Sequence, residues 1–208
     1  MACTVGSVTL ADGSAIAFSQ SGAGADVLLI HGALVTREDM VLALAAELDS
    51  EFRVTAVDRP GHGESTRTGW TGSPWRQAEA LHEACSSLRL ERPVVVGHSH
   101  GGAVALAYSL QFPDDVAGVV ALAPIAFPEL RLEHLVFAPR GVWPVGAWFN
   151  QAVSPTIDRL LLPGLWRAMF IPQQVPPRYA AIFPYDKAGN VPQMEAEGED
   201  SLLLNQGL

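Results

Sequence analysis

The segment that most constrains the fold is Gly97-His98-Ser99-His100-Gly101. It directly follows the apolar run 93–96, typical of a strand, and leads into residues 101–112, whose pattern is helical. A chain that passes from strand to helix so abruptly must turn at Ser99 with a positive φ angle. Glycines at positions 97 and 101 carry no Cβ, so the turn closes without a clash. Ser99 Oγ is then held above the carboxyl edge of a sheet, as in the strand–turn–helix of a nucleophilic serine. The alternative is a glycine-rich turn in which the serine has no chemical role.

Short β-like runs alternate with helical patterns through residues 1–123. Strands are predicted at residues 4–10, 14–20, 27–30, 52–57, 93–96 and 116–123, and the first two form a hairpin across Asp12-Gly13. This alternation predicts an α/β fold, a mostly parallel sheet flanked by helices, with an antiparallel edge from the leading hairpin.

Local signals predict details of the helices. Thr36, with Asp39 three residues on, is close to the capping-box pattern and predicts a helix start. Ser73-Pro74 predicts a second start, with proline at the first helical position. The apolar stripe of this second helix is predicted to be Trp75, Ala78, Leu81, Cys85 and Leu88. The run 116–123 is expected to be a buried strand.

Two further motifs follow two other predicted strands. His31-Gly32-Ala33 comes after the run 27–30, and residues 58–65, Asp-Arg-Pro-Gly-His-Gly-Glu-Ser, come after the run 52–57. With the segment around Ser99, in this order and after a leading hairpin, they resemble the α/β-hydrolase fold family over residues 1–123. The resemblance implies an α/β-hydrolase core with a helical cap after the sixth strand, and serine-type hydrolysis through an acyl-enzyme.

The resemblance also implies roles for individual residues. Ser99 is the expected nucleophile, and the backbone N–H groups of Ala33 and His100 are the expected oxyanion hole. Each such donor typically contributes about 3 kcal/mol to stabilising the tetrahedral oxyanion. His31 and residues 58–65 are expected to shape loops and not to transfer protons.

The acid and the base of the triad are not identifiable in this chain. A serine hydroxyl needs an adjacent base, and in this family the triad runs Ser, Asp or Glu, then His along the chain. After Ser99 the only histidines are His100 and His134, and no acidic residue ends the sixth predicted strand. Glu129 and Glu133, further along, are expected to be solvated charges on a cap helix.

Three explanations stay open. We favour the first, that the chain is the N-terminal part of a longer hydrolase with its C-terminal strands missing, so that residues 1–208 alone are inactive. Residues 202–208 form an apolar run without a continuation, and the strand at 116–123 would be left as an exposed apolar edge. The second explanation is a complete, non-catalytic member that binds a ligand or partner through the same pocket. The third is an unusual triad that recruits His134.

These inferences predict two domains, a core at residues 1–128 and a truncated helical cap at residues 129–208. The expected substrate is a small, apolar molecule with an ester-type or related acyl bond, although carbon–carbon hydrolysis and cofactor-free perhydrolysis stay open. The aspartate nucleophile of epoxide hydrolases and dehalogenases is disfavoured because position 99 is serine. Apolar cap residues either line a substrate pocket or pack the cap onto the core: Trp143, Trp148, Phe149, Leu160, Leu161, Leu162, Trp166 and Phe170. The alternative function is a non-catalytic ligand- or partner-binding protein on the same fold.

The composition of the chain restricts the classes of partner and the cellular location that we expect. The net charge is −9 and no basic cluster occurs, which argues against a nucleic-acid groove or an anionic membrane surface. The longest apolar run, residues 116–127, is too short to span a bilayer. Two cysteines without a CxxC motif, and no basic, apolar leader, predict a cytoplasmic protein with free thiols. His98 and His100 lack an accompanying acidic or cysteine cluster, so we expect no metal and no cofactor, while the oligomeric state stays open.

Overall fold

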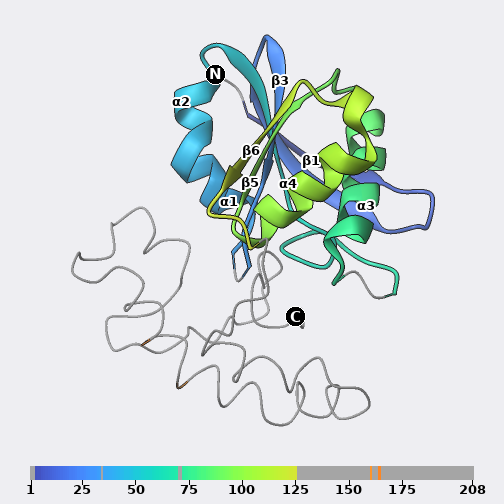
Figure 1. Cartoon of the computed structure of the whole chain (residues 1–208). Helices are drawn as coiled ribbons and strands as arrows, with labels where there is room; N and C mark the ends of the chain where they lie inside the picture. Colours follow the sequence, from blue (N-terminus) through green and yellow to red (C-terminus); the bar gives the residue numbers. More distant parts are fainter. Residues whose placement is uncertain (1–2, 34, 70–71, 126–159, 161–163, 165–208) are drawn as a thin grey trace. The chain divides into compact units, whose positions relative to one another are not determined.

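The computed structural model describes residues 3–33, 35–69, 72–125, 160 and 164, nearly all of them within one compact unit, Met1–Pro128. Six strands form a single sheet in the order β1-β2-β4-β3-β5-β6 (Figure 1). Their bounds are β1 Thr4–Thr9, β2 Ala15–Gly22, β3 Ala25–Ile30, β4 Phe52–Val57, β5 Val94–His98 and β6 Gly118–Leu122. The predicted strands are therefore found, and the predicted α/β fold is confirmed.

The order of the strands reverses direction at β3. β1 pairs with β2 and β2 with β4 in antiparallel fashion, whereas β3, β4, β5 and β6 run parallel. From β3 the chain goes first to β4 on one side and later to β5 on the other. In open α/β sheets, ligands bind beyond the carboxyl ends of strands at such a reversal. The register places Ile30 opposite Gly97, so the ends of β3 and β5 meet there.

Helices cover both faces of the sheet (Figure 1). One face carries α1 Arg37–Met40, a π-helical turn at Val41–Ala45 and α2 Ala46–Leu48. The other carries α3 Pro74–Ser87 and α4 His100–Gln111. Within β3 the side chains alternate: Leu28 and Ile30 join the core under α3 and α4, while Val27 and Leu29 join the core under α1. None of the helices in the described part of the chain is long and apolar enough to cross a membrane.

Two local predictions are wrong, and a third holds only in part. The helix α1 begins after Thr36, which is its N-cap residue as predicted, but the Thr36 hydroxyl donates to the Glu38 carboxylate and caps no backbone N–H. Trp75, in the first turn of α3, is 49% exposed, whereas Ala78 and Leu81 further along the helix are buried. Val120 of the strand expected to be buried is 43% exposed, because β6 is the last strand of the sheet within the described ranges.

The predicted cap lies outside the described residues, as do Glu129, Glu133 and His134. Of the apolar cap residues only Leu160 is described, and its side chain is exposed. The assignment of residues 129–208 to a cap therefore stays a prediction.

Candidate active site

The turn between β5 and α4 has the geometry that the sequence predicts. Ser99 has φ 53° and ψ −116°, which confirms the expected positive φ. A Cβ at Gly97 would lie 2.1 Å from the carbonyl oxygen of Gly101. A Cβ at Gly101 would lie 2.4 Å from the carbonyl oxygens of Ile30 and His31. Only glycine fits either position, so the sequence dictates a strand that turns into a helix at Ser99.

Backbone hydrogen bonds fix Ser99 to the end of β6. Its N–H donates to the Leu122 carbonyl at 2.9 Å, and its carbonyl accepts from the N–H groups of Ile125 at 3.1 Å and Gly102 at 3.0 Å. These bonds hold the main chain in its strained conformation. Among the described residues, no side chain makes a hydrogen bond with Ser99 Oγ.

The turn after β3 passes directly against Ser99. A Cβ at Gly32 would lie 3.2 Å from Ser99 Cβ and 3.1 Å from His98 Nδ1. Ala33, the next residue, is exposed. The structure thus places Gly32 against Ser99, which directly precedes His100, the first residue of α4. What each of these groups does chemically stays a prediction.

His31 is fully buried and both of its ring nitrogens are engaged by the main chain. Nδ1 lies 2.8 Å from the Gly32 carbonyl oxygen, and Nε2 accepts the backbone N–H of Arg59 at 3.0 Å. This pattern requires a neutral imidazole with its proton on Nδ1. Burial, followed by the Arg59 charge, lowers the pKa of His31 well below its usual range. His31 therefore links two loops and holds no mobile proton.

The Arg59 guanidinium is the main feature that the sequence did not predict. It is 2% exposed and its five hydrogens all have acceptors. Nε donates to the His31 carbonyl at 3.0 Å, and Nη2 donates to the Gly32 carbonyl at 2.9 Å. The other acceptors are Gln77 Oε1, His100 Nδ1 and His62 Nε2, at 2.9, 3.1 and 3.1 Å. Burial lowers the pKa of Arg59 to about 10, so the group carries its charge at neutral pH.

Burial, and after it the charge on Arg59, keeps the two neighbouring histidines neutral. Burial is the larger cause and the Arg59 charge the second in lowering the pKa values of His62 and His100 to about 4 each. Both rings can then accept a hydrogen bond from the guanidinium, which a protonated imidazole could not do. The ring of His100 is thereby turned to Arg59.

Asp58 organises the loop that carries Arg59. Its buried carboxylate accepts hydrogen bonds from the Arg37 side chain and from the backbone N–H groups of Arg37 and Glu64, the latter two at 2.8 and 3.1 Å. Burial raises the pKa of Asp58, and Arg37 opposes this shift. A Cβ at Gly63 would lie 2.3 Å from the carboxylate, so the loop passes close to it. These contacts are those of a structural loop, in line with the interpretation of residues 58–65.

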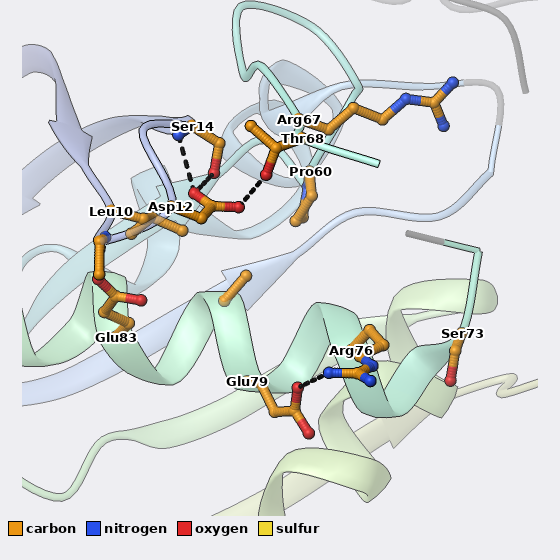
Figure 2. A pocket seen from close by; sticks show the side chains of 12 residues that line it. Leu10, Asp12, Ser14, Pro60, Arg67, Thr68, Ser73, Arg76, Glu79 and Glu83 are labelled. Carbon is orange, nitrogen blue, oxygen red and sulfur yellow. Dashed lines mark hydrogen bonds and ion pairs between the residues drawn. The ribbon is translucent and has the colours of Figure 1, made fainter. Parts of the chain in front are cut away.

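A cavity of about 720 Å³ lies elsewhere, between the β1–β2 turn and α3 (Figure 2). Its acidic groups have partners already: Asp12 accepts from Ser14 and Thr68, and Glu79 pairs with Arg76. Neither Ser99 nor the Gly32 turn lines it. Within the described ranges no group of three or more histidine, cysteine, aspartate and glutamate side chains is arranged to hold a metal ion.

The chain belongs to the alpha/beta hydrolase fold family, which residues 26–164 match. It is 35% identical over 107 residues to an uncharacterized protein of Mycobacterium bovis, covering 51% of this chain and 31% of that protein. It is 32% identical over 106 residues to a monoacylglycerol lipase of Xenopus laevis, covering 50% of this chain and 31% of the lipase. The chain thus spans about a third of the length of these relatives.

Solved structures share the fold at lower sequence identity. The haloalkane dehalogenase DatA of Agrobacterium tumefaciens has a TM-score of 0.67 and 22% identity, covering 88% of this chain and 63% of DatA. A hydrolase of Pseudomonas aeruginosa has a TM-score of 0.63 and 23% identity, covering 77% of this chain and 58% of that one. At these identities the likeness establishes the fold alone.

Proposed function

We propose that the protein is a serine hydrolase that cleaves an ester-type or related acyl bond of a small, apolar substrate through an acyl-enzyme on Ser99. The observation that carries the proposal is the strained Ser99 at the carboxyl end of β5, with φ 53°, against the Gly32 turn. A serine held there lies at the carboxyl edge of the parallel strands, where ligands bind in this kind of sheet. The lipase among the relatives supports an ester-type bond.

In the proposed reaction Ser99 Oγ attacks the carbonyl carbon of the substrate, and the carbonyl oxygen becomes an oxyanion. The backbone N–H groups of Ala33 and His100 donate to this oxyanion. His100 is the first residue of the 12-residue helix α4, whose N-terminus adds a favourable dipole. Expulsion of the leaving group gives the acyl-enzyme, and water then releases the acid and restores Ser99.

The residue at position 99 separates the proposed reaction from that of the structural neighbour DatA. The aspartate nucleophile of family dehalogenases forms an ester that a serine hydroxyl cannot form by displacing halide in the same way. Serine instead favours acyl transfer. The side chain at position 99 therefore decides which reaction we propose, and the activities of proteins that share the fold do not.

A base and an acid must complete the site. Ser99 Oγ needs a proton acceptor, and the leaving group needs a proton. The sequence pattern identifies no triad acid or base, and no imidazole among the described residues bonds Ser99 Oγ, so we expect residues 1–208 alone to react slowly with a fluorophosphonate probe. Rapid, Ser99-dependent labelling of residues 1–208 would contradict this inference, and a loss of that labelling in His134→Ala would identify His134 as the base.

The experiment for the proposed function measures turnover of p-nitrophenyl esters by protein expressed from the whole reading frame. Ser99→Ala is expected to abolish turnover while the circular dichroism spectrum stays unchanged. Ser109→Ala, near the C-terminal end of α4, is a matched control expected to keep turnover. Turnover that survives Ser99→Ala would refute the nucleophile and favour the alternative, a ligand- or partner-binding protein on this fold.

A further inference from the structure

We infer that Arg59 is a positioning residue that aims the oxyanion-hole donor of Ala33 and couples it to His100. The inference rests on the proposed function, because it assigns a role within the same site. Arg59 touches neither the substrate nor the reacting atoms in this account. It acts on the main chain through the Gly32 carbonyl, on the side of the peptide opposite the Ala33 N–H.

Gly32 and Ala33 share a single peptide unit. The carbonyl of Gly32 and the N–H of Ala33 belong to the same planar, trans peptide, so they point in opposite directions. Arg59 Nη2 donates to this carbonyl at 2.9 Å, and His31 Nδ1 lies 2.8 Å from the same oxygen. Two donors therefore fix the carbonyl end of the peptide, and the N–H end must point away from Arg59.

The positive charge of Arg59 adds to its effect on the direction of the Gly32–Ala33 peptide. A hydrogen bond from a cationic donor is stronger than a neutral one, and it polarises the peptide that accepts it. The Ala33 N–H thus becomes a better donor to an oxyanion. A guanidinium can serve in this way because it is planar and rigid, with donors in fixed directions.

The same guanidinium also reaches the second half of the proposed oxyanion hole. Nη1 donates to His100 Nδ1 at 3.1 Å, and the backbone N–H of His100 is the other proposed donor. Arg59 is itself held by the His31 ring, which accepts its backbone N–H at 3.0 Å. One buried cation therefore connects the turn after β3 with the start of α4, and Ser99 lies between these two segments in the site.

The test observes the peptide itself. Carbonyl-¹³C glycine combined with ¹⁵N alanine gives a carbonyl-to-amide correlation only at Gly–Ala pairs. The sequence has five of them: Gly22–Ala23, Gly24–Ala25, Gly32–Ala33, Gly102–Ala103 and Gly146–Ala147. Arg59→Lys keeps the charge but loses the planar fork, so the Gly32–Ala33 signal is expected to move in both carbon and nitrogen dimensions. Gly22–Ala23 and Gly24–Ala25, far from Arg59 in the sheet, serve as internal references.

Gln77→Met is the matched control. It removes a guanidinium partner on Nη1 and leaves the donors to both loop carbonyls in place. The Gly32–Ala33 signal is expected to stay within the scatter of the references in this variant. A signal that stays put in Arg59→Lys, or that moves equally in Gln77→Met, would overturn the inference.

A measurement on the unchanged protein keeps the inference falsifiable if Arg59→Lys does not fold. With ¹⁵N arginine and carbonyl-¹³C glycine, a scalar coupling is expected across the hydrogen bond from Arg59 Nη2 to the Gly32 carbonyl carbon. A fixed, non-exchanging Arg59 guanidinium signal without that coupling would show that the carbonyl is not held.

Kinetics separates this inference from the proposed function. Arg59→Lys is expected to lower kcat by about 10²-fold with KM nearly unchanged, because a misaimed donor fails in the transition state. If Ser99→Ala keeps turnover, the proposed function fails while the NMR result still reports on Arg59. If Ser99→Ala abolishes turnover but Arg59→Lys keeps kcat, the inference on Arg59 alone is wrong.

Discussion

The backbone N–H of Ser99 donates to the carbonyl of Leu122 at 2.9 Å, so the end of β6 holds the strained turn at the end of β5. Three residues after Leu122, the Ile125 N–H donates a second hydrogen bond to the Ser99 carbonyl at 3.1 Å. Between them Ala123 has φ 44°, in the left-handed region. The turn that exposes Ser99 is thus maintained by a neighbouring loop that is itself strained.

The strain at Ser99 predicts an unusual order of stabilities. Ser99→Gly removes the Cβ that disfavours a φ of 53°, whereas Ser99→Ala keeps it. We expect Ser99→Gly to have a free energy of unfolding about 1 kcal/mol higher than Ser99→Ala, measured by urea denaturation. The paired control is Ser109 in the helix α4, where glycine should be about 1 kcal/mol worse than alanine. The same order at both positions would show that Ser99 is not strained.

Close packing at Gly101 predicts a loss of stability from one methyl group. Gly101→Ala brings a Cβ to within 2.4 Å of the carbonyl oxygens of Ile30 and His31, and backbone atoms cannot easily move aside. We expect a decrease of about 1–3 kcal/mol or more in the free energy of unfolding. Gly118→Ala is the control, since among the described residues its Cβ meets no atom within 4 Å. Equal stability of the two variants would contradict the packing described for the turn.

The oxyanion hole can be tested by removing one N–H. Ala33→Pro deletes the proposed donor and is expected to lower kcat on p-nitrophenyl esters by about 10²-fold or more. Ala33→Ser keeps the N–H, so its kcat should stay within a few-fold of the parent protein. If Ala33→Pro folds and keeps its kcat, the Ala33 donor is not used.

The sequence was sufficient for the sheet and for the turn at Ser99. Continuous apolar runs such as Val27–Ile30 are typical of buried strands. The glycines at 97 and 101 fit a single backbone path between strand and helix. It was not sufficient for the network around Arg59. The acceptors of this guanidinium come from four separate segments, at residues 31–32, 62, 77 and 100, and no local pattern links them. The one local signal was the position of Arg59 in the motif that follows the strand β4.

The missing cap on α1 has a similar cause. Thr36 has a suitable residue type for an N-cap, but the Glu38 side chain competes for its hydroxyl. Residue type alone does not reveal such a competitor.

The neutral histidines predict a dependence of stability on pH. The pKa of His62 is lowered to about 4 from the ordinary 6.5, first by burial and then by Arg59. Between these two values the unfolded chain binds more protons, so the free energy of unfolding falls as the pH falls. His62→Gln removes this titration, and the slope over that window should become shallower than in the parent protein. Asp58, whose pKa is raised, titrates in both proteins and drops out of the comparison.

Urea denaturation at a series of pH values between about 4 and 6.5 gives both slopes. Parallel slopes for the parent protein and His62→Gln would mean that His62 is not held neutral against Arg59.

The position of a covalent adduct shows whether Ser99 is the nucleophile. Protein expressed from the whole reading frame is treated with a fluorophosphonate, digested and mapped by mass spectrometry. We expect one adduct, on the peptide that contains Ser99, and none in Ser99→Ala, whose fold is verified by circular dichroism. An adduct on another residue, or labelling that persists unchanged in Ser99→Ala, would contradict it.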